Sequence, residues 1–332
     1  MLQKLPEKPL FSIAIGDLNH FSKIIKDSGK GIKDFTALKE YYVHIQLRNV
    51  ESFPTPRATD ETVGVSTTEG NRDVTIDDYL DMMNYLRCDS FVSFNDEVQL
   101  SVGKRRGKQS VFRNKDWLQR HVQKADESQG GIIANIQVTD NTQLLDEQLE
   151  IVKQNANSIL GINIAGLYLG ENSQQRSSLL QYVISSIPEN LVRFVTGPNT
   201  PFEVLESMRQ GIDLTVCSYP IDLAEKAYLS CYWNGGSVYI NQKSKLNLMD
   251  TIYENDKSPL MENCDCYACK HFTKGYLHHL FNCHELLGVI LLTQHNIHHF
   301  IQFMSNARQS IATNEFDKFY EDFMKNCSES SL

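Results

Sequence analysis

Short apolar runs alternate with longer amphipathic stretches in the middle of this chain. Residues 131–138 read GIIANIQV, residues 162–168 read INIAGLY and residues 191–196 read LVRFVT. Stretches with helical periodicity lie between them, at 143–158 and 175–187. Short strands separated by helices of this length predict right-handed βαβ units and therefore a parallel sheet. Both faces of such a sheet are covered, so its strands do not need to alternate apolar and polar residues.

The same alternation continues on both sides of this segment. It predicts strands at 10–15, 42–47, 89–94 and 213–218, and helices at 17–27, 115–126 and 201–210. The resulting seven candidate strands are close to the eight of a (β/α)₈ barrel. The rival is an open doubly wound sheet, but no Gly-x-Gly-x-x-Gly motif follows any of the strands. Residues 52–74, with Pro54 and Pro56, are expected to form a long irregular loop.

The character of the chain changes after Pro220. Apolar runs at 227–231 and 237–240 flank Asn234-Gly235-Gly236, a pattern typical of a β-hairpin. Three clustered cysteines follow, and then dense helical periodicity from 272 to 324. We therefore expect two parts, a barrel body at 1–225 and a zinc-binding subdomain at 226–332 whose last helices complete the barrel.

Charge and hydrophobicity restrict the class of protein. The 332 residues include 32 Lys and Arg against 41 Asp and Glu, a formal net charge of -9. A protein that binds nucleic acid mainly through its charge normally has the opposite balance. The longest apolar run, Leu286–Leu292, is too short for a membrane helix, and the N-terminus has no apolar signal core. These features predict a soluble intracellular chain.

The cysteines indicate a metal site. Cys264, Cys266 and Cys269 form a Cys-x-Cys-x2-Cys cluster, and His295 follows after 25 residues. Without a secretory context such a cluster is more typical of metal binding than of disulfides or isolated structural thiols. Three thiolates and one imidazole complete tetrahedral Zn²⁺ and leave no open position, so the zinc would be structural. Other candidates for the fourth ligand are His271, His278, His279, Cys283, His284, His298 and His299.

With this spacing the chain resembles the tRNA-guanine transglycosylases, from about residue 65 to 305. Five further segments match motifs of that family in the same order along the chain. The resemblance implies a (β/α)₈ barrel, with or without its first strand, and an inserted zinc subdomain that contributes to a dimer contact. It also implies a role in exchanging guanine at the wobble position of tRNA for queuine. The matching segments are Gly166–Glu171, Gly197–Pro201, Gly211–Pro220, Tyr276–Phe281 and Gln294–Asn296.

The chain departs from the family where catalysis would occur. The family's nucleophilic aspartate corresponds to Val216, which cannot attack the ribose. Asp213 lies three positions away and faces the other side of a strand, and Asp222 and Glu225 lie in the following loop. The motif of the second catalytic aspartate is absent, and residues 131–136 lack the family's purine-reading Gln and Gly-Gly. Asp96 resembles a base-contacting aspartate, although a solvated acid at a strand end explains it equally well.

These departures imply that no residue of this chain is catalytic. The resemblance is then to the family's accessory subunits, which form heterodimers with a catalytic queuine tRNA-ribosyltransferase subunit and meet tRNA through the complex. It further implies a cytoplasmic location with peripheral association at the mitochondrial outer membrane. Two alternatives stay open: a transglycosylase that uses a relocated carboxylate, and a free-standing zinc-stabilised RNA-binding scaffold.

Two further features can be interpreted either as binding surfaces or as ordinary parts of the fold. Lys104-Arg105-Arg106-Gly107-Lys108, with Arg113 nearby, is either a contact for tRNA phosphates or a solvated loop. The apolar helix at Leu286–Leu292, with Phe300 and Phe303, forms either a partner interface or part of the chain's own core. His278 and His279 are expected to pack beside the zinc site.

Overall fold

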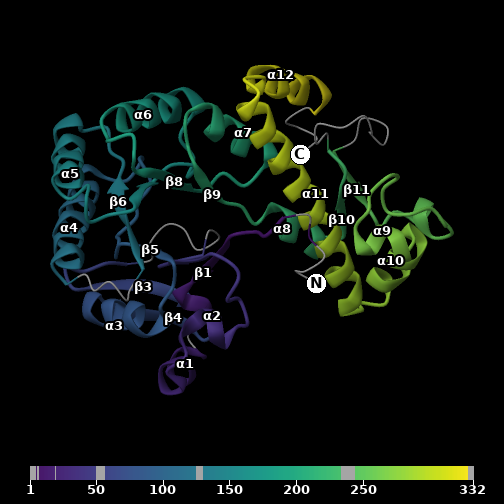
Figure 1. Cartoon of the computed structure of the whole chain (residues 1–332), viewed down its shortest axis with the longest axis horizontal. Helices are drawn as coiled ribbons and strands as arrows, with labels where there is room; N and C mark the ends of the chain where they lie inside the picture. The colour runs from purple at the N-terminus through teal and green to yellow at the C-terminus, as the bar shows by residue number, and fades with distance from the viewer. Residues whose placement is uncertain are drawn as a thin grey trace. The chain divides into compact units, whose positions relative to one another are not determined.

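Seven parallel strands form a nearly closed barrel in one of the two units of this chain (Figure 1). The computed structural model describes residues 5, 7–18, 20–49, 57–124, 130–232 and 244–327. The barrel unit comprises Leu10–Pro198 and Gln210–Val216. The helical unit comprises Met1–Pro9, Asn199–Arg209 and Cys217–Leu332. The division into a barrel body at 1–225 and a zinc-binding subdomain at 226–332 stays a prediction.

The strand order in the barrel follows the sequence, with β1 and β9 at the two ends. All seven predicted strands are confirmed, and so is the α/β barrel class. The parallel register places Asn135 opposite Asn163 and Thr196 opposite Val216. The strands are β1 (Phe11–Ala14), β2 (Val43–Gln46), β5 (Ser90–Val92), β6 (Gly131–Gln137), β7 (Gly161–Ala165), β8 (Val192–Thr196) and β9 (Leu214–Val216).

Helices surround the barrel because each connection between parallel strands returns along the outside of the sheet. Several of them begin where the sequence offers a capping side chain: Asn141 accepts a hydrogen bond from Leu144 N, and Asn172 accepts one from Gln175 N. The helical elements of the barrel unit are η2 (Ile15–Leu18), α1 (Ser22–Ser28), α2 (Gly31–Phe35), α3 (Ile76–Leu86), α4 (Lys104–Gln123), α5 (Thr142–Gln154) and α6 (Ser173–Ser185).

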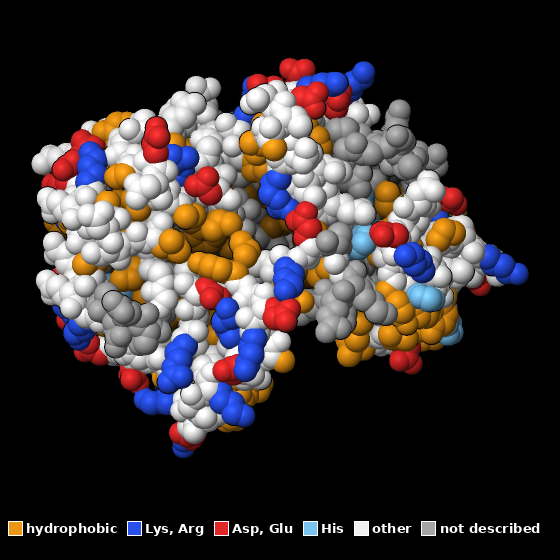
Figure 2. Space-filling view, viewed as in Figure 1, with side chains coloured by type: hydrophobic (Ala, Val, Ile, Leu, Met, Phe, Trp, Pro, Cys, Tyr) orange, Lys and Arg blue, Asp and Glu red, His pale blue; other side chains and the backbone are white. Residues whose placement is uncertain are grey.

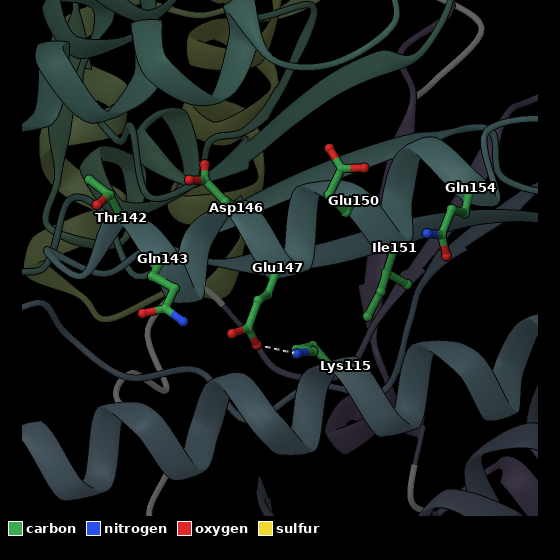
Figure 3. A pocket seen from close by; sticks show the side chains of 8 residues that line it. All are labelled: Lys115, Thr142, Gln143, Asp146, Glu147, Glu150, Ile151 and Gln154. Atoms are coloured by element: carbon green, nitrogen blue, oxygen red, sulfur yellow. Dashed lines mark hydrogen bonds and ion pairs between the residues drawn. The ribbon is translucent and has the colours of Figure 1, made fainter.

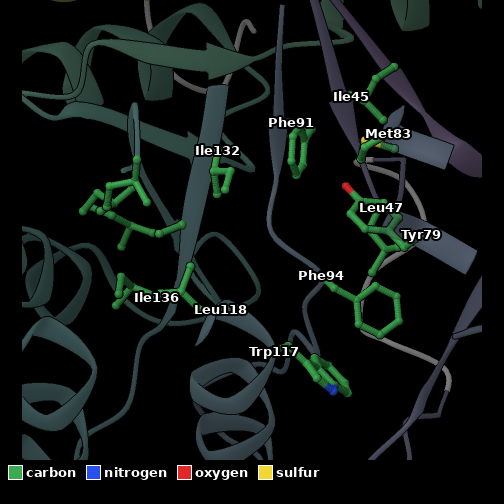
Figure 4. Close-up of a cluster of buried hydrophobic side chains, with 14 of the residues drawn as sticks. Ile45, Leu47, Tyr79, Met83, Phe91, Phe94, Trp117, Leu118, Ile132 and Ile136 are labelled. Carbon is green, nitrogen blue, oxygen red and sulfur yellow. The ribbon is translucent and has the colours of Figure 1, made fainter. Parts of the chain in front are cut away.

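The main core lies between the strands and these helices. Along β6, Ile132, Ala134 and Ile136 belong to this core, and the alternate residues point into the barrel. Figure 4 shows the aromatic side chains of the core, among them Trp117 of α4 and Phe94. Their rings meet edge to face with centroids 4.7 Å apart, a favourable aromatic geometry.

Two predictions for the barrel unit were wrong. Residues 57–74 are not an irregular loop, because β3 (Thr62–Thr67) and β4 (Gly70–Thr75) pair as an antiparallel hairpin. Val63, Gly64 and Val65 are buried in it, while residues 68–73 are exposed to solvent; residues 52–56 lie outside the described residues. The second error concerns α4, which begins at Lys104 rather than at 115, so the basic stretch at 104–108 is helical and not a loop.

The helical unit is built on the long helix α11 (Leu286–Ala312). The strand predicted at 227–231 is confirmed as β10 (Tyr228–Ser230), which pairs antiparallel with β11 (Lys245–Asn247). The turn predicted at 234–236 and the strand at 237–240 lie outside the described residues. The remaining elements are α7 (Pro201–Arg209), α8 (Tyr219–Glu225), η5 (Thr251–Tyr253), α9 (Tyr267–His271), α10 (Lys274–Asn282) and α12 (Phe316–Asn326).

Phe303 of α11 lies in a core of the helical unit and not at a partner interface, the alternative that the sequence left open. Its side chain is fully buried among Tyr232, Phe319 and Phe323. Phe300 packs against the same cluster, so these two residues belong to the chain's own interior. Within the described part of the chain, no helix combines the length and the apolar character needed to cross a bilayer.

Candidate metal centre and barrel interior

The structure brings the four predicted metal ligands together in the helical unit. The sulfurs of Cys264, Cys266 and Cys269 and one imidazole nitrogen of His295 all lie within 4.8 Å of one another. His295 Nδ1 is 3.7, 3.5 and 3.3 Å from the three sulfurs in that order. Ligands at ordinary Zn–S and Zn–N distances around a tetrahedral ion would be about 3.6 Å apart. The four side chains therefore fit a metal ion of this kind.

Local structure explains why these side chains converge. Cys266 is the N-cap of α9, and its Sγ accepts a hydrogen bond from Cys269 N at 3.3 Å, which places the two sulfurs on one side of the helix start. His295 lies in the middle of α11 and is fully buried. Its Nε2 is 3.1 Å from the carbonyl oxygen of Ser230 on β10. That hydrogen bond directs Nδ1 toward the sulfurs, as outer partners of metal-ligating histidines do.

The charges of the cluster also suit a cation. Burial lowers the pKa of His295, but hydrogen bonds to Cys264 and Cys266 outweigh it and raise this pKa to about 10. Hydrogen bonds from Cys264 and Cys269 lower the pKa of Cys266. Metal ligands must be deprotonated, so a bound ion would take the place of the protons that these groups share.

The other candidate ligands have different partners. His278 Nδ1 is 2.8 Å from Leu248 O, and His299 Nε2 is 2.9 Å from Tyr232 O. His298 Nε2 is 2.8 Å from Asp265 Oδ1, beside the cluster but outside it. His279 and Cys283 contact each other on the exposed side of α10, and neither they nor His271 and His284 belong to the cluster.

Asn296 supports the four-residue cluster, and its role was not predicted. The residue is fully buried and uses both ends of its amide. Its Oδ1 accepts hydrogen bonds from the backbone N and the Oγ of Ser230, at 2.9 and 3.0 Å. Its Nδ2 donates to Pro220 O at 3.1 Å and Tyr228 O at 3.0 Å. Asn296 thereby fixes β10, which carries the carbonyl that orients His295, against α11.

Inside the barrel unit, Val216 lies at the carboxyl end of β9. It packs with Val92, Ile133, Phe194 and Leu214, the inward-facing apolar residues of the neighbouring strands. Active sites of (β/α)₈ barrels form at the carboxyl ends of the strands, so position 216 is at the end where chemistry would occur. Asp213 precedes the strand, and its carboxylate accepts a hydrogen bond from Arg193 N at 2.8 Å.

The remaining candidate carboxylates belong to the helical unit. Asp222 accepts hydrogen bonds from Asn199 Nδ2 at 3.1 Å and Ser218 Oγ at 2.9 Å. Glu225, at the end of α8, is exposed. The prediction that these two residues lie in a loop was wrong, because both belong to α8 (Tyr219–Glu225), and Asp222 binds Ser218 and Asn199 at the start of that helix.

Polar side chains occupy the barrel interior beside Val216. Asn135 Oδ1 accepts hydrogen bonds from Asn95 Nδ2 at 3.1 Å and Asn163 Nδ2 at 2.8 Å. Arg48 donates to Asn95 Oδ1 at 3.0 Å and lies 3.7 Å from the Glu97 carboxylate. Burial raises the pKa of Glu97, because the nearby Arg48 and the Gly166 amide offset only part of the desolvation.

These contacts leave little space in the barrel. The cavity among Arg48, Glu97 and their neighbours measures about 10 Å³, which is about enough for one water molecule. Pockets for small ligands are typically about 300 Å³ or more. The cavity is lined by Gln46, Leu47, Arg48, Val92, Asn95, Glu97, Asn163 and Thr196.

Asp96 lies beside this cavity's wall but does not line it. The carboxylate is fully buried and accepts hydrogen bonds from Arg106 at 2.6 Å and Arg113 at 3.0 Å, both from α4. Asn114 Oδ1 in turn accepts from Asp96 N at 2.7 Å. Asp96 is therefore not a solvated acid; it anchors α4 to the end of β5.

A surface groove lies elsewhere on the barrel unit, between α4 and α5 (Figure 3). It has a volume of about 570 Å³, and Asp146, Glu147 and Glu150 give it an acidic character. Lys115 Nζ binds Glu147 at 2.6 Å across the groove. No predicted site residue lines it.

Comparison with known proteins gives a consistent result. A family described as queuine tRNA-ribosyltransferase matches residues 9–329. The queuine tRNA-ribosyltransferase of Helicobacter hepaticus is 30% identical over 259 residues, which are 74% of this chain and 63% of that protein.

Two insect proteins match over more of the chain. The queuine tRNA-ribosyltransferase accessory subunit 2 of Anopheles gambiae is 26% identical over 314 residues, 90% of this chain and 73% of its own length. The protein of the same name in Aedes aegypti is 25% identical over 340 residues, 96% of this chain and 79% of its own length. The chain thus spans between about three fifths and four fifths of these relatives.

Proposed function

Because this chain belongs to the queuine tRNA-ribosyltransferase family, we propose that it is the non-catalytic subunit of a heterodimeric enzyme that exchanges wobble guanine in tRNA for queuine. It stabilises the catalytic subunit and orients it and the tRNA. The names of the two insect relatives, which call them accessory subunits, support this assignment. The complex acts in the cytoplasm, with peripheral association at the mitochondrial outer membrane, a location that rests on the resemblance alone.

The observation that carries the proposal is Val216. Its apolar side chain, packed with Val92 and Phe194 at the carboxyl end of the strands, has no atom that attacks an anomeric carbon. The cavity beside it admits about one water molecule, and its lining includes Arg48 and Asn95, which are hydrogen-bonded to each other. A barrel with a filled interior and no nucleophile at position 216 fits a subunit that supports a catalytic partner better than it fits an enzyme.

The metal in this chain is a structural Zn²⁺ bound by Cys264, Cys266, Cys269 and His295. Three of these side chains are buried and the fourth is partly buried, and together they supply a complete tetrahedral set. Zinc therefore holds α9 against α11 and keeps the 226–332 subdomain in one conformation.

The partner binds an apolar surface formed by Leu286, Leu287 and Ile290 of α11 and Tyr276 of α10. These side chains are 70%, 41%, 44% and 39% exposed. Figure 2 shows hydrophobic side chains gathered over α10 and the start of α11. An exposed apolar surface beside a metal-ordered helix pair is typical of a protein interface, and its occupant is the catalytic subunit.

The test measures queuine exchange into tRNA by this chain alone, by the catalytic subunit alone and by the two together. Activity only in the mixture, lost on zinc chelation, is the expected result. Exchange by this chain unaided would overturn the proposal and return attention to Asp213, Asp222 and Glu225. Tight tRNA binding without any effect on the catalytic subunit would indicate an RNA-binding scaffold instead.

The interface is tested by Ile290→Asp. This change should abolish heterodimer formation in gel filtration and leave the zinc content at one ion per chain. Ile311→Asp is the matched control: Ile311 lies on the same helix and is 48% exposed, about 30 Å away along the axis. Equal assembly of both variants would place the interface elsewhere.

A further inference from the structure

The first turns of α4 carry a concentration of cations. Lys104, Arg105, Arg106 and Lys108 all lie within its first five residues, and the first turn contains no acidic residue. Cations near a helix N-terminus interact unfavourably with the helix dipole. A local rule broken without a compensating contact points to a function.

Two arginines of this helix have a structural role. Arg106 and Arg113 bind the buried carboxylate of Asp96, as described above. Lys104, Arg105 and Lys108 are exposed, and none lies within 4 Å of a carboxylate oxygen in the ion pairs of the described residues. These three charges therefore face solvent on a chain whose net charge is -9.

An exposed aromatic ring continues this cationic surface. Lys104, Lys108 and Phe112 are spaced four residues apart, so they lie on one face of α4. Phe112 is 46% exposed, and Lys108 Nζ lies 5.5 Å from the centre of its ring. Lys115 Nζ lies at the same distance from the ring, but it also binds Glu147.

The position of this face in the barrel is also informative. Residues 93–103 connect β5 to α4, and Arg106 binds Asp96, four positions past the end of β5, so the start of α4 lies near the carboxyl end of that strand. Binding surfaces of (β/α)₈ barrels form at that end. A row of cations that ends in an exposed ring fits a nucleic-acid strand, because the cations meet phosphates and the ring stacks on a base.

We propose that the face formed by Lys104, Arg105, Lys108 and Phe112 binds RNA directly, with the three cations on backbone phosphates and Phe112 stacked on an unpaired base. Since the RNA is the tRNA of the proposed heterodimer, this inference rests on the proposed function and assigns this chain its own contact. An acidic protein segment would also be attracted by the cations, but it would offer no flat group to Phe112.

The experiment compares two matched sets of variants in the reconstituted complex. Lys104→Ala/Lys108→Ala removes two cations of this face, and Lys23→Ala/Lys30→Ala removes two exposed lysines near α1. Phe112→Ala is matched by Phe21→Ala, since Phe21 is 50% exposed. The dissociation constant for tRNA is measured between 50 and 300 mM salt, roughly the range in which phosphate contacts are lost.

The expected results separate the two kinds of contact. Lys104→Ala/Lys108→Ala should reduce the salt dependence, the slope of log K against log salt, by about 1.4 to 1.8, which corresponds to two phosphate contacts. Phe112→Ala should weaken binding roughly tenfold and leave the slope unchanged. In exchange assays, Lys104→Ala/Lys108→Ala and Phe112→Ala should each raise KM for tRNA and leave kcat unchanged. The control pairs should behave as the unmodified complex.

An unchanged slope in Lys104→Ala/Lys108→Ala, or an equal change in Lys23→Ala/Lys30→Ala, would overturn the inference. A normal slope together with poor assembly would show that the face binds a protein instead of RNA. If the unmodified chain fails to assemble with the catalytic subunit, the proposed function fails. The same slopes measured on the full chain alone then still decide whether this face binds RNA.

Discussion

Replacing Asn296 with leucine tests whether the metal site depends on the contacts around it. Leucine has nearly the same volume but cannot form the four hydrogen bonds of the asparagine amide. Ser230 N, Pro220 O and Tyr228 O would lose this partner, while the Ser230 hydroxyl can rotate. A buried backbone group without a partner costs about 1–3 kcal/mol. Three such groups would cost about 3–9 kcal/mol, and we expect the free energy of unfolding to fall by an amount at the lower end, about 3–5 kcal/mol, because Tyr228 is partly exposed.

The same change should weaken metal binding. Ser230 also presents the carbonyl that orients His295, so a displaced β10 loosens one of the four ligands. Loss of such an outer contact typically lowers metal affinity about 10- to 100-fold. Urea unfolding followed by circular dichroism measures the stability, and competition with a chromogenic chelator at fixed pH measures the affinity.

Gln309→Leu is the control, because it replaces an exposed amide on the same helix. Its unfolding free energy should stay within about 0.5 kcal/mol of the unmodified chain. Two results would refute the reasoning. A loss below about 1 kcal/mol in Asn296→Leu would show that the backbone groups find other partners. Normal metal affinity in a clearly destabilised variant would show that Asn296 does not position His295.

Three further outcomes are expected. Cys266→Ser should remove zinc, measured by metal analysis, and heterodimer formation, measured by gel filtration; a dimer without zinc would contradict the role of the metal. Val216→Ala should leave exchange by the complex within about twofold, since the change removes two methyl groups and no reactive group; a large loss would mean that position 216 faces a working site. Burial lowers the pKa of His121 to about 3, and its Nε2 accepts from Phe94 N. The stability from neutral His121 is complete above its unfolded pKa of about 6.5 and is lost as the pH falls toward 3, so about 2 kcal/mol should disappear between pH 7 and 5. Urea unfolding at the two pH values measures the loss, which should be smaller by this amount in His121→Gln, while His44 and His299, whose pKa burial also lowers, contribute equally in both proteins.

The seven barrel strands could be predicted because their apolar runs are separated by helices with clear periodicity. The β3–β4 hairpin could not, because only Val63, Val65 and Val74 face the core and the intervening residues are polar. The start of α4 was missed for a related reason. Its first ten residues are mostly basic or polar, and what holds them is a tertiary contact from Arg106 to Asp96.

Sequence spacing also predicted the four-residue cluster, because a Cys-x-Cys-x2-Cys turn needs only local geometry to bring its three sulfurs together. Two other sets of contacts, one around Asn296 and one around Arg48, could not be predicted. Asn296 contacts Pro220 and Ser230, which are more than 60 positions away in the chain, and Arg48 meets Glu97 only when the barrel closes. Spacing along the sequence gives no signal for contacts of this range.

A metal ion at the four-ligand cluster would act as a staple between distant parts of the chain. It would tie Cys264 to His295, 31 positions later, and close the loop that contains α9 and α10. Closing a loop of that length with a covalent bridge restricts the unfolded chain by about 4 kcal/mol. Disulfides give such restriction only in oxidising compartments. A metal–thiolate link gives it where thiols stay reduced, so a cell can open this staple by withholding the ion but not by supplying reductant.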